Sequence, residues 1–374
     1  MKQRGKQRRE AEQRKEGAPT TLPPVVAVKE EEVTSPGRGR NSKLQGVSKL
    51  DRENRDDATL ARLGVSGGGP QKVTVAGVEI WFWSAEVRSA IPKGILFLAH
   101  GANHGAYDFF SPREVHGGVG LPEERALLLA ARRRGYACVA VSSVDRRRKI
   151  WVHEVDGPRV ARVLGAMARA FMMPVHALGV SNGAAFVFHL ALYIKIDALC
   201  SQIMALDHDI LAVLANQKGF PARVCFAHMP RDTETASAVR ANVGALNSDA
   251  LVAGRTIDEF ELKPAAITEQ FFVDRLGYMY PLPKAANAVL AGELVKALKT
   301  RRFLDAEDRL LSDPRRSSWR GVLRPVLAKH GAIDSFVADE SPMAEVLNVA
   351  YGLHECCATH CDDVFAFLLD EDER

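Results

Sequence analysis

The segment "PVHALGVSNGAAFVF", residues 174–188, limits most strongly what this chain can fold into. One apolar run ends at Val180, and a second begins at Ala184 with the spacing of a buried helix. Between them, Gly179–Gly183 form a G-x-S-x-G turn around Ser181 that joins a strand to a helix. The tight turn crowds the backbone, and the two glycines relieve the clash. Such a turn points the serine hydroxyl over the end of a sheet, beside the free N–H groups of the helix.

Strand-like and helix-like segments alternate from residue 72 onward. The strand-like ones include "GILFLAHG", "YACVAVSSVD", "DALCSQIMALD" and "PARVCFAHMPRD". This alternation predicts a mostly parallel sheet with helices on both faces. Ligands bind such sheets at the carboxyl ends of the strands. Polar candidates follow four of the strands there, namely the segment 100–102, Ser181, Asp207 and Asp232.

The chain divides into parts of different composition. Residues 1–71 are rich in charged residues, Pro and Gly and have no apolar face, so we expect a disordered tail. Its basic run leaves a nuclear address or a contact for an acidic partner open. Residues 72–374 are expected to form one α/β domain. Within it, residues 264–340 or so have a helical pattern, which predicts an insertion that caps the site before the last helix.

Composition excludes several function classes. A formal net charge of +4 on 374 residues gives no case for a nucleic-acid partner. An apolar run long enough to cross a membrane is absent from the sequence. We interpret the six cysteines as reduced thiols of an intracellular protein, in the cytoplasm or an organelle. Cys356, Cys357, Cys361 and His360 lie close in sequence, but adjacent cysteines are poor joint ligands, so we expect no metal and no cofactor.

A serine hydroxyl needs a histidine base and an acid that orients the histidine before it can act as a nucleophile. In α/β-hydrolases these groups follow the chain order serine, acid, histidine. Ser181, Asp232 and His354 obey that order. Asp232 follows the strand "ARVCFAH", and Asp207, which follows the preceding strand, is the alternative acid.

The base must come from the three histidines after Asp232, namely His330, His354 and His360. His330 precedes a glycine at the end of the predicted insertion, far from any strand end. His354 borders an apolar stripe of the predicted last helix, whereas His360 is followed by two aspartates. Six residues apart on one helix, they cannot both reach the same hydroxyl. We therefore expect His354 to be the base, approaching Ser181 from the last helix or from the loop that leads into it, and His360 to be solvated.

Two backbone N–H groups are expected to bind the oxyanion formed during acyl transfer. The N–H of Asn182 follows the nucleophile, and the N–H of Ala102 lies in the loop after an earlier strand. The side chain of His100 is expected to shape that loop. The simpler alternative for the whole G-x-S-x-G segment is a glycine-rich turn whose serine only caps the helix.

Five segments, "LFLAHGANHGAYDFF", "GLPEER", "HALGVSNG", "HMPRDTETASAVRANV" and "LNVAYGLHE", together resemble a family of α/β-hydrolase proteins from plants and algae that lacks a defined substrate. The resemblance extends from about residue 93 to the end of the chain. It implies the α/β-hydrolase fold, with Ser181 as nucleophile, Asp232 as acid and His354 as base. The chain departs from the family at "SPREVHGGVGLPEE", which lacks cysteines found in similar sequences, and at Asn182, where a small residue is commoner.

The sequence therefore predicts a carboxylesterase-like serine hydrolase that cleaves a small-molecule ester through an acyl-enzyme on Ser181. An amide, thioester or lactone is equally compatible with these residues. The alternative is a non-catalytic binding protein that keeps the fold and its pocket, although such a protein need not keep all three polar residues. A nuclear protein that acts through the basic tail is a third class, which the small net charge disfavours. The sequence gives no indication of oligomeric state.

Overall fold

The computed structural model describes residues 58–63, 68–86, 92–248, 254–335 and 337–371. Most of the expected disordered tail, residues 1–57 and 64–67, lies outside them. Residues 58–63 are helical, and Leu60 and Leu63 are buried in the main apolar core. These two leucines lie three residues apart on one face of the helix. Because both are buried, the folded part of the chain begins before residue 72.

An eight-stranded sheet forms the centre of the described part of the chain, with the order β1-β2-β4-β3-β5-β6-β7-β8. β1 and β2 form an antiparallel hairpin, β2 is antiparallel to β4, and the remaining pairs are parallel. The hairpin turn places Ala76 and Gly77 at positive φ, as tight hairpins require. The strands are β1 (Gln71–Val75), β2 (Val78–Trp83), β3 (Gly94–Ala99), β4 (Tyr136–Ala140), β5 (Val175–Val180), β6 (Ala198–Gln202), β7 (Arg223–His228) and β8 (Thr256–Glu261).

Helices cover both faces of the sheet. Successive residues of β3 point to opposite faces, so Phe97 lies in one apolar core while Leu96 and Leu98 lie in the other. The first core lies under α4 (His153–Phe171), α5 (Asn182–Leu190), α6 (His208–Ala215) and α7 (Thr233–Asn247). The second lies under α3 (Pro122–Arg134) and α12 (Cys361–Leu369). This strand order with helices on both faces is the α/β-hydrolase fold, which confirms the predicted fold class.

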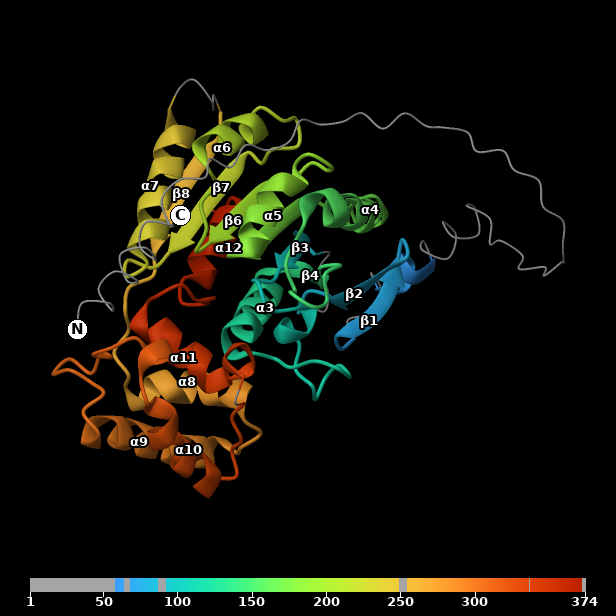
Figure 1. Ribbon diagram of the computed structural model, residues 1–374. Coiled ribbons are helices and arrows are strands. Elements are labelled where there is room, and N and C mark those ends of the chain that lie inside the picture. The colour runs from blue at the N-terminus through green and yellow to red at the C-terminus, as the bar shows by residue number, and fades with distance from the viewer. Residues whose placement is uncertain (1–57, 64–67, 87–91, 249–253, 336, 372–374) are drawn as a thin grey trace, which may run out of the picture. The chain divides into compact units, whose positions relative to one another are not determined.

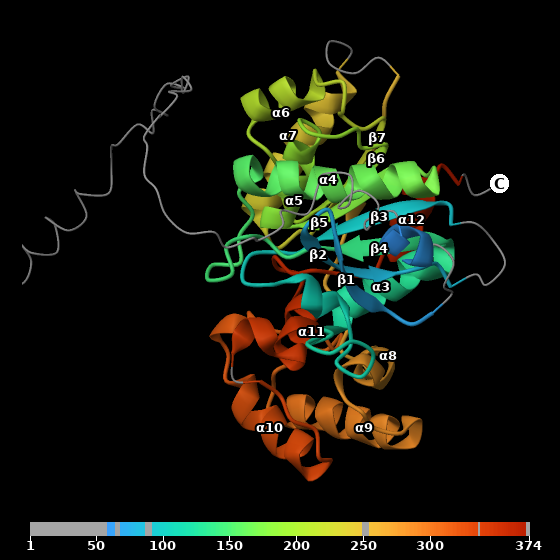
Figure 2. The ribbon, with the colours of Figure 1, turned by 90° about the vertical axis from the view of Figure 1, so that its right-hand side faces the viewer.

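Four further helices form a separate group, here called the cap: α8 (Glu269–Met279), α9 (Lys284–Thr300), α10 (Trp319–Lys329) and α11 (Pro342–Tyr351). They share their own apolar core, which includes Phe272, Leu294, Trp319 and Leu347. Figures 1 and 2 both show α11 between the sheet and the pair α9 and α10. Among the described residues, no helix is long and apolar enough to cross a membrane.

The predicted last helix is in fact two helices. α11 ends at Tyr351, where Gly352 takes a left-handed φ of 78° and closes the helix. α11 packs in the cap core, whereas α12 packs against the sheet. The apolar stripe around His354 therefore belongs to two elements, and His354 lies in the loop between them. α6, which follows β6, was not predicted.

Candidate active site

The turn after β5 holds Ser181 in a strained backbone conformation, with φ 51° and ψ −118°. The flanking glycines make this turn possible. A Cβ on Gly179 would lie 2.3 Å from the carbonyl oxygen of Gly183, and a Cβ on Gly183 would lie 2.4 Å from the carbonyl oxygens of Ala99 and His100. Side chains at these two positions are excluded by backbone atoms, so the turn depends on glycine at both.

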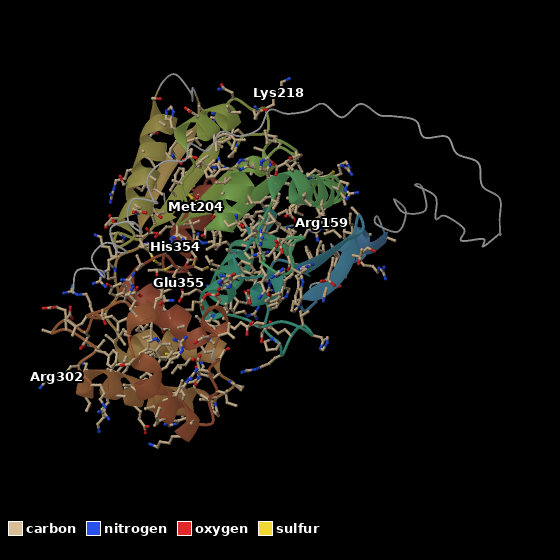
Figure 3. All side chains as sticks on the ribbon, viewed as in Figure 1. Arg159, Met204, Lys218, Arg302, His354 and Glu355 are labelled. Carbon is tan, nitrogen blue, oxygen red and sulfur yellow. The ribbon has the colours of Figure 1, made fainter. Side chains whose placement is uncertain are left out.

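The hydroxyl of Ser181 does not cap α5, although the residue occupies the N-cap position. Its Oγ lies 3.0 Å from Nε2 of His354 instead. Nδ1 of His354 lies 2.6 Å from Oδ2 of Asp232. When Nδ1–H donates to this carboxylate, Nε2 is left as the acceptor for the serine hydroxyl. The structure thus brings together three residues that lie far apart in the sequence, at the carboxyl end of the sheet. Figure 3 shows His354 between the sheet and α11.

Asp232 lies at the N-cap of α7, where its Oδ1 accepts from the backbone N–H of Thr235 at 3.4 Å. Burial alone would raise the pKa of Asp232, but the hydrogen bonds from His354 and Thr235 lower it below its usual value. The carboxylate is therefore ionised near neutral pH and stabilises a positive charge on the imidazole. The alternative acid, Asp207, lies at the N-cap of α6, and the structure places Asp232 rather than Asp207 against His354.

The loop that contains His354 is hydrogen-bonded to the cap region. Arg315, in the short helix η2 (Pro314–Arg316), donates to the carbonyl oxygens of Leu353 and His354 at 2.7 Å each. His354 itself has a left-handed φ of 42°. Arg315 could not be identified from the sequence, because its contact with this loop depends on tertiary packing and leaves no local pattern.

The other two histidines lie elsewhere. His360 occupies the N-cap of α12, with Nδ1 3.2 Å from Asp363. His330 follows α10 and lies 3.2 Å from Glu293. Of the three histidines after Asp232, the structure brings His354 to Ser181. His354 lies in the loop that leads into α12, which is one of the two positions expected for it. The two histidines do not share one helix as expected, because α11 and α12 are separate.

Ala102 lies in the loop after β3, and Asn182 is the first residue of α5. Within the described part of the chain, neither backbone N–H donates to another residue. Trp151 links the two segments: its backbone N–H donates to Oδ1 of Asn182 at 2.6 Å, and its indole N–H donates to the carbonyl oxygen of His100 at 2.9 Å. Its ring stacks on Phe186 at 4.3 Å. Trp151 was also missed by the sequence analysis.

His100 is buried and shapes the loop that contains Ala102. Its Nδ1 lies 2.7 Å from the carbonyl oxygen of Gly101, and its Nε2 accepts from the backbone N–H of Ser143 at 3.1 Å. Burial lowers the pKa of His100 to about 3, so the ring is neutral at physiological pH. A neutral ring with its proton on Nδ1 satisfies both hydrogen bonds.

A cavity of about 460 Å³ opens beside Ser181 and His354. Its wall also contains residues of the cap region, including Arg315 and Trp319, so the cap and the sheet together enclose it. This volume suits a small molecule. Among the described residues, no group of three or more His, Cys, Asp or Glu side chains is arranged to hold a metal ion.

Comparisons with known proteins give distant likenesses. No family model and no curated protein matches the chain. Solved structures that share part of the fold include dienelactone hydrolase from Anabaena variabilis, with 14% identity and a TM-score of 0.35 over 60% of this chain and 97% of that one. Monoglyceride lipase from Saccharomyces cerevisiae aligns with 12% identity and a TM-score of 0.35, over 53% and 88%. An α/β serine hydrolase without a lid from Xanthomonas campestris aligns with 15% identity and a TM-score of 0.35, over 53% and 86%.

Proposed function

We propose that this protein is a serine hydrolase that cleaves an ester, or a related acyl bond, of a small molecule through an acyl-enzyme on Ser181. The observation that carries the proposal is the hydrogen-bonded series from Ser181 through His354 to Asp232, at the wall of a cavity. The strained turn supports it as well, since strain of this kind is retained where it aims a reacting group.

In the first half of the reaction, Oγ of Ser181 attacks the carbonyl carbon while its proton passes to Nε2 of His354. Asp232 stabilises the resulting imidazolium. The negative oxygen of the tetrahedral intermediate accepts hydrogen bonds from the N–H groups of Ala102 and Asn182. The intermediate then expels the alcohol, which takes the proton from His354. In the second half, water gives a proton to His354 and attacks the acyl carbon. The tetrahedral intermediate then releases the acid and expels Oγ of Ser181, which takes the proton back from His354.

Three further expectations accompany this proposal. The cap limits which substrates reach the cavity, because its region contributes Arg315 and Trp319 to the wall. An intracellular setting is supported by the six cysteines, all of which are free thiols. We also expect the chain to belong to the family of plant and algal α/β-hydrolase proteins that its motifs resemble, a family that assigns no substrate.

Labelling with a fluorophosphonate probe tests the proposal, because the probe reacts covalently with an activated serine. The parent protein should be labelled and should hydrolyse p-nitrophenyl esters of short acids. Ser181→Ala should abolish both, and His354→Ala should lower turnover by several orders of magnitude. His360→Ala is the matched control and should retain full activity. A folded parent protein that takes no label would contradict the proposal and favour a binding protein.

A further inference from the structure

We propose that the substrate carries a cationic group that donates hydrogen bonds, such as a primary ammonium, and that this group binds at the end of the cavity formed by Glu124 and Glu345. The inference names a substrate class for the proposed hydrolase and in that respect rests on the proposed function.

Three buried oxygen atoms at this end of the cavity accept no hydrogen bond from an N–H or hydroxyl group in the described part of the chain, although Glu124 and Glu345 share a hydrogen bond with each other. They are Oε2 of Glu124, Oε1 of Glu345 and Oδ1 of Asn348. The three residues are 3%, 6% and 8% exposed, and all line the cavity that contains Ser181. A buried acceptor without a donor costs free energy, and more so when it is charged. A proton shared by Glu124 and Glu345 supplies one donor to these three atoms, whereas an ammonium group supplies three.

The basic side chains around the acidic pair neutralise it only in part. Each basic group on the cavity wall has another acidic neighbour: His104 has Asp108, Arg315 has Glu355, and Arg320 has Asp334. Nε of Arg320 is itself a buried donor without an acceptor, on the cap side of the cavity. The nearby Glu123 is paired with Arg275 at 2.8 Å. His104, whose pKa is raised to about 9, despite its burial, by the hydrogen bond to Asp108 and by the charge of Glu124, is a positive neighbour that Glu124 shares with Asp108. The charged groups that act on Glu345 are acidic.

The protonation of the pair agrees with a cation site that holds no cation. Burial raises the pKa of Glu124, and burial together with the charge of Glu124 raises the pKa of Glu345 well above its usual value. The two side chains are hydrogen-bonding neighbours, which requires a proton between them. An ammonium ligand would replace this proton, so binding should release protons and tighten as the pH rises. The other titratable groups facing the pair are His104, Asp108, Glu123 and Glu355.

The position of the site suits a substrate that reaches it from Ser181. Glu345 and Asn348 lie on successive turns of α11, and Glu124 lies in the first turn of α3. Nδ2 of Asn348 donates to Glu355 at 2.8 Å, and Glu355 directly follows His354 in the chain. The cavity therefore has a reacting end at His354 and an acidic end at α11, which fits a substrate with its acyl bond at one end and its charge at the other.

Matched pairs of esters test the inference. In each pair an ω-amino acid ester is compared with the ester in which a methyl group replaces the ammonium, for example p-nitrophenyl ε-aminocaproate against p-nitrophenyl heptanoate, over a series of chain lengths. The parent enzyme should prefer the best ammonium ester in kcat/KM by about 10–100-fold, the effect of charge-assisted hydrogen bonds. Glu124→Gln and Glu345→Gln should each lower this ratio by about tenfold or more. Glu293→Gln, a matched change on the surface of the cap, should leave the ratio unchanged.

A binding measurement separates this inference from the proposed reaction. Isothermal titration calorimetry of the Ser181→Ala variant compares ε-aminocaproamide and its ω-amino homologues with the matched neutral amides, in buffers of different ionisation enthalpy. The ammonium amide should bind more tightly and release protons. If the ammonium amide binds more tightly and releases protons while the parent hydrolyses no ester, the cation site is supported and the proposed function is contradicted. If the neutral amides bind as tightly at every chain length, or if both Gln variants keep the parent preference, the inference is overturned and the glutamates form a proton-sharing structural pair.

Discussion

The backbone N–H of Trp151 donates to the side-chain oxygen of Asn182 at 2.6 Å, directly beside the proposed nucleophile. The indole N–H of Trp151 donates at the same time to the carbonyl oxygen of His100, at the start of the loop that contains Ala102. One residue thus fixes the distance between the two segments that carry the proposed oxyanion donors. Asn182, which departs from the small residue common at this position, provides the acceptor that makes this link.

The first prediction concerns Asn182. Asn182→Ala removes the acceptor for Trp151 but keeps the backbone N–H that binds the oxyanion. Because the two donors would then be less well aligned, kcat for p-nitrophenyl esters should fall by about tenfold, with little change in KM. Trp151→Phe, which keeps a ring over Phe186 and loses the indole N–H, should give the same split between kcat and KM. Equal kcat values in the parent and in both folded variants would show that the link does not position the donors.

The second prediction concerns Gly183, two residues after the proposed nucleophile. A Cβ on Gly183 would lie 2.4 Å from the carbonyl oxygens of Ala99 and His100, so β3 and α5 would have to separate. Gly183→Ala should therefore lower the free energy of unfolding by about 2–3 kcal/mol and reduce fluorophosphonate labelling. Gly321→Ala in α10 is the matched control, because no atom lies within 4 Å of its added methyl group. The control should be neutral or stabilising by up to about 1 kcal/mol. Denaturant titration of the two variants distinguishes these outcomes.

Most of the features that could be predicted from the sequence have local causes. The strand, turn and helix around Ser181 follow from apolar spacing and from two glycines that relieve a local clash. The contact between Ser181, His354 and Asp232 could be predicted from the order of the three residues along the chain, because the order of the strands brings residues in that sequence order to one edge of the sheet. The expected single helix over His354 and His360 was wrong, because Gly352 ends α11 and the apolar residues before and after it pack in different cores.

Contacts between distant elements could not be predicted in this way. Arg315 reaches the loop of His354 from the cap, and Trp151 reaches Asn182 from the loop before α4. Neither residue belongs to a sequence motif or a periodic pattern that would predict its contact. From the sequence alone, Glu124 is an acidic residue in the first turn of a predicted helix, where its negative charge interacts favourably with the helix dipole. Its burial beside Glu345 appears when α3 and α11 pack together.

The third prediction concerns acid stability. His176 is buried in β5 with Nδ1 2.6 Å from the hydroxyl oxygen of Tyr136, and burial lowers the pKa of His176 to about 4. In the unfolded chain its pKa is about 6.5, so the unfolded state binds a proton first as the pH falls. This contribution to stability is therefore fully present above pH 6.5 or so and is lost progressively toward about pH 4.

Denaturant titrations at pH 7 and pH 4.5 measure this loss. We expect His176 to account for about 2–3 kcal/mol of the fall in the free energy of unfolding of the parent between these two pH values. His176→Gln, which keeps a polar side chain but does not titrate, should show a fall smaller by that amount. His100, with its pKa near 3, adds a loss of the same sign in both proteins. Identical pH dependence in the parent and the variant would contradict the assignment.

The last prediction concerns the helix at residues 58–63, within the segment whose composition predicts a disordered tail. Leu63 is 1% exposed and belongs to the same apolar core as Val75 and Phe82 of the first hairpin. Leu63→Ala should therefore lower the free energy of unfolding by about 2–5 kcal/mol, the usual cost of truncating a buried leucine. The neighbouring Arg62 is exposed, and Arg62→Ala should change stability by less than about 0.5 kcal/mol. Equal stability of the two variants would mean that this helix does not belong to the folded domain, and that the domain begins at the first strand, where the charge pattern alone placed it.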